Sequence, residues 1–429
     1  MRRGEAAEFT WKGRNRDNAD MVLFSHRDYD PLLLGSPLRR RGPCFAIGVA
    51  LLVLLGFAAL VQLNLVAGMR PDIELVFFTA LALSSLLALV PLRILWYLDR
   101  RERETPWLFA AAFFWGGLIA TGLALPFNTA FAHIVDAWVA QNPMVREVLG
   151  PEAATILSAP ISAPLVEEST KALGLLALFW LLRAEFDNMR DGIVYGALVG
   201  LGFTWFEAPI YVAQGYAETG VAPWGMQLGW RYALLGFGGH ALFTAIFGAS
   251  LGLALQTRRR WLRVLAPIGG LALAILAHAL NNALPLFFAL AAAAAGEPPP
   301  QDDGTEAGLG FVQAFLLGSA VELTIFLPFV AILAVALWRS GVWERRVIRE
   351  ELAAEVGRTV SEREYDAIAA DGMFRTRLID PARPRQSAAL VNAQHELAFR
   401  KRRVRDEGRD PDADRLVDGW RNEIRRLRA

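Results

Sequence analysis

The sequence predicts an all-α protein, a polytopic membrane bundle of about eight transmembrane helices that carries a small cytosolic helical tail. Hydrophobic residues make up 54% of the 429 residues and charged residues 20%. The charged residues gather in residues 1–41, in short loops and after Trp338. Between them lie apolar segments that each supply the roughly 20 residues needed for a membrane-spanning helix.

These segments divide the chain into an N-terminal segment (1–42), a membrane domain (43–340) and a tail (341–429). The first apolar segment begins too far along the chain, and is too long, for a cleavable signal peptide, so it predicts a signal anchor. Pro164 suits the first turn of the fourth helix. The predicted spans lie near residues 43–68, 74–98, 106–133, 164–182, 192–214, 229–256, 264–290 and 310–338.

Arginine is concentrated in alternate loops, and this predicts the orientation of the spans. Basic runs precede the first span and follow the second, fourth, sixth and eighth, whereas the loop at 291–308 has only acidic charges. Because basic loops stay on the cytoplasmic side, both termini should be cytoplasmic. The preference for arginine over lysine is typical of a GC-rich bacterial source, so we expect the plasma membrane of a bacterial cell.

The tail has the apolar spacing of helices over 343–357 and 387–404, and prolines interrupt it. Its charged runs are typical of solvated helix faces. A net charge of +1 gives no electrostatic reason to expect nucleic acid as a partner, and the lipid bilayer is the expected environment. The single cysteine, Cys44, excludes an intrachain disulfide and a cysteine-based metal cluster.

The most informative feature is a cluster of charge inside the fourth span. Glu167 and Glu168 are followed by Lys171, and the helical spacing of three and four residues lets Lys171 reach either carboxylate. A carboxylate at mid-bilayer costs about 2.5 kcal/mol or more by insertion scales. Charge in this position therefore indicates a functional site.

Later spans contain further polar groups at a similar depth. Glu168, Glu207, His240 and His278 each lie 15 to 18 residues from the charged residue at the inner end of their helix. That separation corresponds to about 22–27 Å along a helix. The common depth predicts one shared site in the outer half of the bilayer.

Single residues also have structural explanations. His278 alone could form an interhelical hydrogen bond, with Asn281 and Asn282 one turn further on. Glu322, in the last span, has no partner nearby in the sequence, and we expect a structural role for it. Gly196 and Gly200, four residues apart, predict close packing of the fifth helix against a neighbour.

Two histidines and two or three carboxylates without cysteine suit a divalent metal such as zinc, with one coordination position open for water. Glu207, His240 and His278 are the candidate ligands, and Glu167 or Glu168 is the candidate general base. Lys171 would keep the glutamate pair charged and oriented. The H-E-x-x-H motif of soluble zinc proteases is missing, so the ligands would come from separate helices.

Four short motifs resemble those of the PrsW family of intramembrane proteases and, more distantly, of the CAAX-protease and bacteriocin-processing superfamily. The resemblance covers roughly residues 90–290 and leaves out the first span, the eighth span and the tail. It departs from the family at Ala208, where an asparagine is common. The motifs are E-E-S-T-K from Glu167, F-E-A-P-I-Y from Phe206, H-A-L-F from His240 and H-A-L-N from His278.

The resemblance implies cleavage of a membrane-anchored protein substrate, typically an anti-sigma factor, by a metalloprotease. The wider superfamily implies an alternative without metal, in which a glutamate activates water while histidine and asparagine stabilise the oxyanion. Asn282 is the candidate asparagine, counted with the catalytic residues. Two other classes remain open: an ion- or proton-coupled transporter, for which we find no inverted repeat, and an inactive relative that binds a membrane partner.

Overall fold

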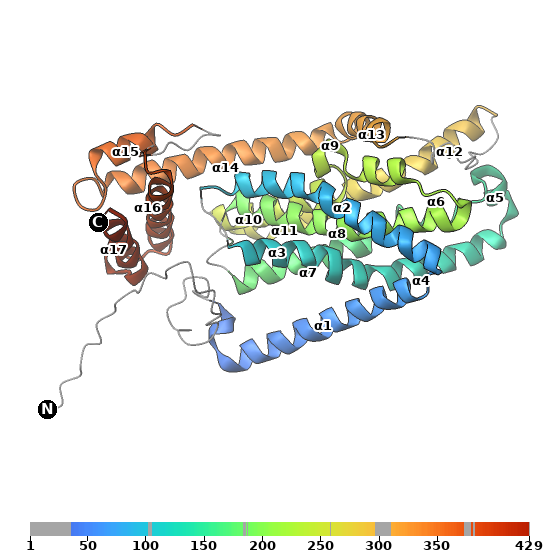
Figure 1. Ribbon diagram of the computed structural model, residues 1–429, viewed down its shortest axis with the longest axis horizontal. Helices are drawn as coiled ribbons and strands as arrows, with labels where there is room; N and C mark the ends of the chain where they lie inside the picture. Colours follow the sequence, from blue (N-terminus) through green and yellow to red (C-terminus); the bar gives the residue numbers. More distant parts are fainter. Residues whose placement is uncertain are drawn as a thin grey trace.

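The structure is a computed structural model in which a bundle of long helices carries a group of shorter helices at one end (Figure 1). It describes residues 36–101, 105–182, 186, 188–257, 259–296, 310–372, 379–380 and 382–428. Most of the N-terminal segment 1–42 and most of the acidic loop 291–308 therefore lie outside the described residues.

The described residues form helices and contain no β-strand. Those before residue 190 are η2 (Pro37–Arg39), α1 (Arg41–Ala67), α2 (Pro71–Leu98), α3 (Pro106–Phe114), the π-helical η3 (Trp115–Ala120), α4 (Thr121–Ala140), α5 (Pro143–Leu149), α6 (Ala153–Ser158), α7 (Ser162–Leu181) and the start of α8 (Met189–Thr219). They are followed by the π-helical η4 (Gly225–Gly229), α9 (Ala233–Gly236), α10 (His240–Gln256), α11 (Arg260–Asn282), α12 (Leu284–Ala294), α13 (Phe311–Ile325), α14 (Leu327–Ala353), α15 (Glu362–Ala369), α16 (Pro384–Asp406), η6 (Pro411–Ala413) and α17 (Arg415–Arg428).

The all-α membrane bundle predicted from the sequence is confirmed. Within the described residues, seven helices are long and apolar enough to cross a membrane. The fourth predicted span corresponds to α7, which has 20 residues but includes Glu167, Glu168 and Lys171, so its composition keeps it out of the seven. α1 buries only Ala58 and Gln62, and its exposed apolar side chains suit contact with lipid.

Three predicted spans are interrupted in the structure. The span at 264–290 divides at Ala283, and the span at 310–338 divides at Phe326; in both cases a proline follows in the first turn of the next helix, where its missing N–H is tolerated. The span at 229–256 is a continuous helix only from His240. In addition, α14 runs on to Ala353, so the boundary expected at residue 340 falls inside a helix.

α8 is the central helix of the bundle, because 94% of its most apolar stretch is buried. Glycines at four-residue intervals bring it against the backbone of α10. A Cβ atom on Gly192, Gly196 or Gly200 would lie 2.0 Å from Gly248 O, 2.6 Å from Thr244 O or 2.2 Å from His240 O, respectively. The close packing predicted for Gly196 and Gly200 is therefore present, and Gly200 touches the backbone that carries His240.

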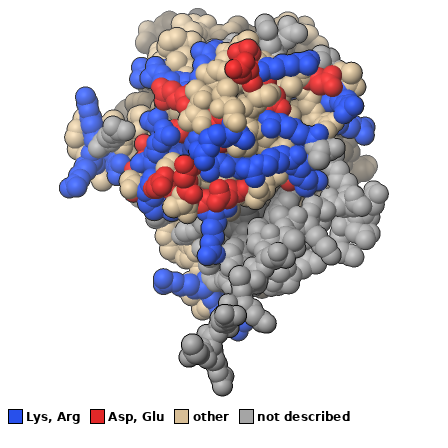
Figure 2. Space-filling view, turned by 90° about the vertical axis from the view of Figure 1, so that its left-hand side faces the viewer, with Lys and Arg blue, Asp and Glu red and all other residues tan. Residues whose placement is uncertain are grey.

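The tail folds around its own apolar core, formed by the end of α14 with α15, α16 and α17. Figure 2 shows Lys and Arg side chains interspersed with Asp and Glu on this end of the molecule, which is the pattern of solvated helix faces. The tail also contacts the membrane domain. Glu344 of α14 forms ion pairs with Arg101 and Arg190 at 3.2 and 2.9 Å, and His395 Nδ1 lies 3.1 Å from the Arg101 carbonyl.

Candidate active site

Four helices bring the polar groups of the spans to one place. α7 contributes Glu167 and Glu168, α8 contributes Glu207, α10 begins at His240, and α11 contributes His278. All five side chains are buried. α10 begins at His240 because Gly239 has φ +53° and ψ −130°, a conformation that only glycine adopts readily.

Lys171 lies at the centre of the cluster and is fully buried. Its Nζ is 2.8 Å from Glu168 Oε1 and 3.4 Å from Glu167 Oε2, and 3.8 Å from the centre of the Phe203 ring. The sequence left open which glutamate Lys171 would reach, and in the structure it reaches both. A buried ammonium group needs such compensation by opposite charge.

Two carboxylates orient the two histidines. His278 Nδ1 lies 3.1 Å from Glu168 Oε1, and His240 Nε2 lies 2.9 Å from Glu207 Oε2. Because an ionised carboxylate only accepts hydrogen bonds, each of these ring nitrogens carries the proton. The other nitrogens then accept: His240 Nδ1 from Lys171 Nζ at 2.9 Å, and His278 Nε2 from Asn282 Nδ2 at 3.3 Å.

Glu167, His240 and His278 form a group that could hold a metal ion. One ligand atom from each lies within 4.8 Å of the others, and Glu167 Oε2 is 3.9 Å from His240 Nδ1 and 4.0 Å from His278 Nε2. A carboxylate binds the far nitrogen of each imidazole, as is usual for metal-binding histidines. These three ligand atoms therefore fit a divalent cation. Binding requires that Lys171 and Asn282, which donate hydrogen bonds to the two ring nitrogens facing the site, move away from them.

The structure brings every candidate residue of the sequence analysis into one cluster, but Glu207 and Asn282 have different contacts from those expected. Glu207 supports His240 from outside the three-residue group, and Glu167 occupies the position in that group expected for Glu207. Asn282 reaches the cluster only through His278 and donates also to the Ala159 carbonyl at 3.2 Å.

Among the described residues, three that donate hydrogen bonds to the glutamates of the cluster were missed in the sequence analysis. Asn128 donates to Glu167 Oε1 at 3.0 Å, Arg231 donates to Glu207 Oε2 at 2.7 Å, and Thr244 donates to Glu168 Oε2 at 3.0 Å. Asn128 and Arg231 are polar residues within predicted spans, but they lie further than 18 residues from the charged residue at the inner end of their span, so the depth that selected His240 did not select them. Thr244 gave no signal, because a threonine hydroxyl is common in membrane helices.

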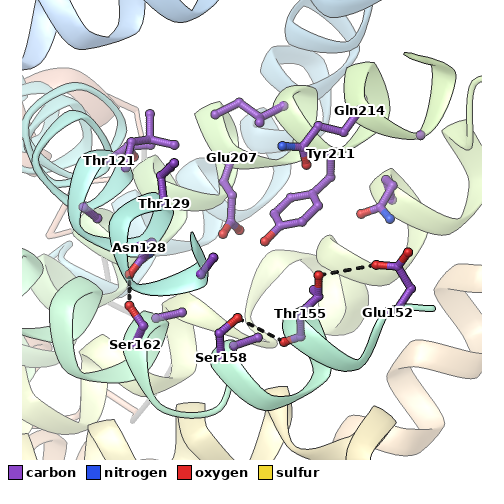
Figure 3. Close-up of a pocket in the computed structure, with 18 of the residues that line it drawn as sticks. Thr121, Asn128, Thr129, Glu152, Thr155, Ser158, Ser162, Glu207, Tyr211 and Gln214 are labelled. Atoms are coloured by element: carbon purple, nitrogen blue, oxygen red, sulfur yellow. Dashed lines mark hydrogen bonds between the residues drawn. The ribbon is translucent and has the colours of Figure 1, made fainter. Parts of the chain in front are cut away.

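A cavity of about 470 Å³ opens beside the cluster and is lined by residues of α4, α6, α7, α8 and η4. Glu167 and Glu207 line it, whereas Glu168 does not. Figure 3 shows Glu207 and Tyr211 on one side of the cavity, facing Asn128, Ser158, Ser162 and Thr155. Water in the cavity can therefore reach Glu167, while Glu168 is enclosed by its partners.

Comparison with known proteins bears on this site. Residues 104–336 match the family model described as PrsW family intramembrane metalloprotease. A "Protease PrsW" of Geobacillus kaustophilus is 37% identical over 105 residues, which are 24% of this chain and 42% of that relative. A "Protease PrsW" of Halalkalibacterium halodurans is 30% identical over 118 residues, 27% of this chain and 48% of that relative.

The chain thus spans about half the length of the curated relatives it matches, and no solved structure matches it. The expectation of a PrsW-like protein is confirmed. The extent of the resemblance needs correction, since the family match runs from residue 104 to residue 336 and includes most of the eighth predicted span.

Proposed function

Because the chain belongs to the PrsW family of intramembrane metalloproteases, we propose that it hydrolyses a peptide bond in a membrane-anchored protein. The observation that carries this proposal is the meeting of Glu167, His240 and His278 beside a cavity that admits water. Burial of these groups in a bilayer would be costly without a function.

Glu167 is the proposed reacting carboxylate, as a ligand in the mechanism with metal and as the base in the mechanism without it, because it lines the cavity and Glu168 does not. In hydrolysis, a water molecule gives a proton to a base while its oxygen attacks the scissile carbonyl carbon. The proton then passes to the leaving amine nitrogen as the C–N bond breaks. Lys171 favours the ionised forms of Glu167 and Glu168 through its contacts at 3.4 and 2.8 Å, and Asn128 donates a hydrogen bond to Glu167.

The proposed cofactor is a divalent cation, with zinc the first choice for two imidazoles and a carboxylate. Glu167, His240 and His278 would hold it, and Glu168 and Glu207 would fix the two imidazoles. When bound, such a cation polarises a carbonyl and lowers the pKa of water. In the alternative without metal, Glu167 alone activates water, and His240, His278 and Asn282 are the proposed donors to the oxyanion.

The proposed substrate presents an extended, polar segment to the site. Beside apolar residues, the lining of the cavity includes hydroxyl and amide side chains, among them Thr129, Thr155, Gln214 and Gln227. These groups can bond the backbone of a peptide that has left its helix. We place the cytoplasmic side at the tail, so this segment would enter from outside the cell; an anti-sigma-factor-like protein in a bacterial plasma membrane remains the proposed partner.

The proposal is tested by reconstituting the purified protein in liposomes with a single-span substrate that has a polar segment next to its membrane helix. We expect cleavage in that segment, located by mass spectrometry of both products. Removal of divalent ions by a chelator, followed by addition of zinc, separates the two mechanisms. No cleavage of any such substrate, with or without zinc, would contradict the proposed function.

A further inference from the structure

The chain leaves the helical conformation between η4 and α10, in the segment that carries Arg231 and His240. Leu234 and Leu235 have φ values of +51° and +59°, in the left-handed region that large side chains rarely adopt. Strain of this kind is often found at functional sites. Arg231 precedes the break and His240 follows it. In a continuous helix these two residues would be about two and a half turns apart and would lie on opposite faces.

In the structure, both side chains instead bind the same oxygen atom. Arg231 Nη1 donates to Glu207 Oε2 at 2.7 Å, and His240 Nε2 donates to the same atom at 2.9 Å. Hydrogen bonds to an ionised carboxylate are stronger than those between neutral groups, so they offset part of the strain in the break. The interruption of the helix therefore brings Arg231 and His240 together at Glu207.

The Arg231 side chain is itself held in place. Its Nε donates to Gln227 Oε1 at 3.1 Å, and its guanidinium carbon lies 4.0 Å from the centre of the Tyr211 ring. Glu207, Tyr211 and Gln227 all line the cavity, whereas Arg231 does not. A planar guanidinium that is stacked on a ring and bonded to two side chains has little freedom to move, so Arg231 is a fixed support behind the cavity wall.

The two buried cations of the site have separate carboxylate partners. Among the described residues, Lys171 forms ion pairs with Glu167 and Glu168, and Arg231 forms one with Glu207. Because Glu207 lines the cavity, without Arg231 its carboxylate would turn toward water, which solvates a charge better than an apolar interior does. His240 Nε2 would then lose its acceptor.

We propose that Arg231 is a positioning residue that fixes Glu207 and, through Glu207, orients the His240 ring; this inference rests on the proposed function. With Nε2 bonded to Glu207, the other nitrogen, Nδ1, faces Glu167 Oε2 at 3.9 Å. Arg231 thus determines which nitrogen of His240 is turned toward the reacting carboxylate. Its effect on the reaction passes through Glu207, since Arg231 does not line the cavity.

The test compares Arg231→Gln, which removes the charge, with Arg231→Lys, which keeps it. Arg70→Gln is the matched control, because Arg70 forms an ion pair with Asp72 at 3.1 Å in which both side chains are exposed.

NMR of the metal-free full chain in liposomes, labelled with 15N in its histidines, reports the ring directly, since the two ring nitrogens differ with the position of the proton and its hydrogen bond. The His240 signals are those lost in His240→Gln. We expect the Nε2 signal of His240 to shift or broaden in Arg231→Gln and to stay near its wild-type position in Arg231→Lys and in the control.

Cleavage kinetics then test the link to the reaction. In Arg231→Gln, kcat should fall about 10-fold or more while KM is nearly unchanged. Arg231→Lys should restore most of kcat, and Arg70→Gln should cleave at the wild-type rate. An unchanged His240 signal in Arg231→Gln, or a changed signal with normal kcat, overturns the proposal.

The double variant Arg231→Gln/Glu207→Gln tests the route through Glu207. Because both changes act on one contact, it should match Glu207→Gln alone in kcat and in the His240 signal; a further loss overturns the proposal. This variant leaves neither partner charged, and the same comparison decides the question if Arg231→Gln does not fold. If the wild-type protein cleaves nothing, the proposed function fails, and the His240 signal still decides whether Arg231 positions the ring.

Discussion

Replacing Gly200 by alanine should separate the geometry of the site from the stability of the fold. The new Cβ would lie 2.2 Å from the carbonyl oxygen of His240, whereas ordinary contacts begin at 3.4 Å, so α10 must move about 1.2 Å at His240. Neither partner is a flexible side chain, so the backbone itself has to move. A misplacement of about 1 Å in a catalytic group costs on the order of 100-fold in rate, and overpacking costs about 1–3 kcal/mol of stability.

Gly192→Ala is the matched control. Its Cβ would meet Gly248 O at 2.0 Å in the same helix interface, about 12 Å along α8 and away from the site. Thermal unfolding and cleavage of a reconstituted substrate are measured for both variants. Both should lose similar stability, but only Gly200→Ala should lose about 100-fold in kcat. A folded Gly200→Ala variant with wild-type kcat, or an equal loss in both variants, would refute the reasoning.

Three other predictions concern the surroundings of the site and the tail. Asn128→Ala should lower kcat/KM about 10- to 100-fold, because Glu167 loses its donor at 3.0 Å; unchanged cleavage kinetics would show that Asn128 does not orient it. Burial lowers the pKa of His395 to about 4, so the tail should lose stability as pH falls from about 6.5 toward 4 in urea unfolding; a His395→Gln variant with the same pH profile would contradict this. Removing residues 354–429 should leave cleavage within a few-fold of normal, since α6, which lines the cavity, lies at the end of the bundle away from the tail (Figure 1). Complete loss of cleavage with normal membrane insertion would contradict it.

The sequence predicts the bundle well because lipid imposes a simple rule on each span. Apolar length located α1, α2, α8 and α11, and four-residue glycine spacing predicted that α8 packs closely against a neighbour, which the structure shows to be α10. The rule fails where protein replaces lipid around the backbone. Leu234 and Leu235 leave the helical region inside an apolar segment, which is tolerated because Ser319 satisfies the freed N–H of Leu234. The apolar composition of the segment does not reveal that a side chain from another helix forms this hydrogen bond.

The candidate site was predictable for a similar reason, since charge inside an apolar span is rare. Glu167, Glu168 and Lys171 stand out on α7, and His240 and His278 stand out at the same depth. The depth of a residue in the bilayer does not determine the direction in which its side chain points around the helix axis. Glu207 and Glu167 lie in the same layer, but only contacts show that Glu207 meets Arg231 and His240. The roles of the glutamates therefore depended on the packing.

The central claim is that Glu167 acts with His240 and His278 in peptide hydrolysis. The most direct test is the cleavage rate of Glu167→Gln in liposomes, compared with Glu147→Gln, which removes an exposed carboxylate on α5 outside the cavity. Loss of a reacting carboxylate should lower kcat by about 100-fold or more, with normal insertion and thermal stability, while Glu147→Gln should retain full activity. Wild-type turnover by Glu167→Gln would contradict the account.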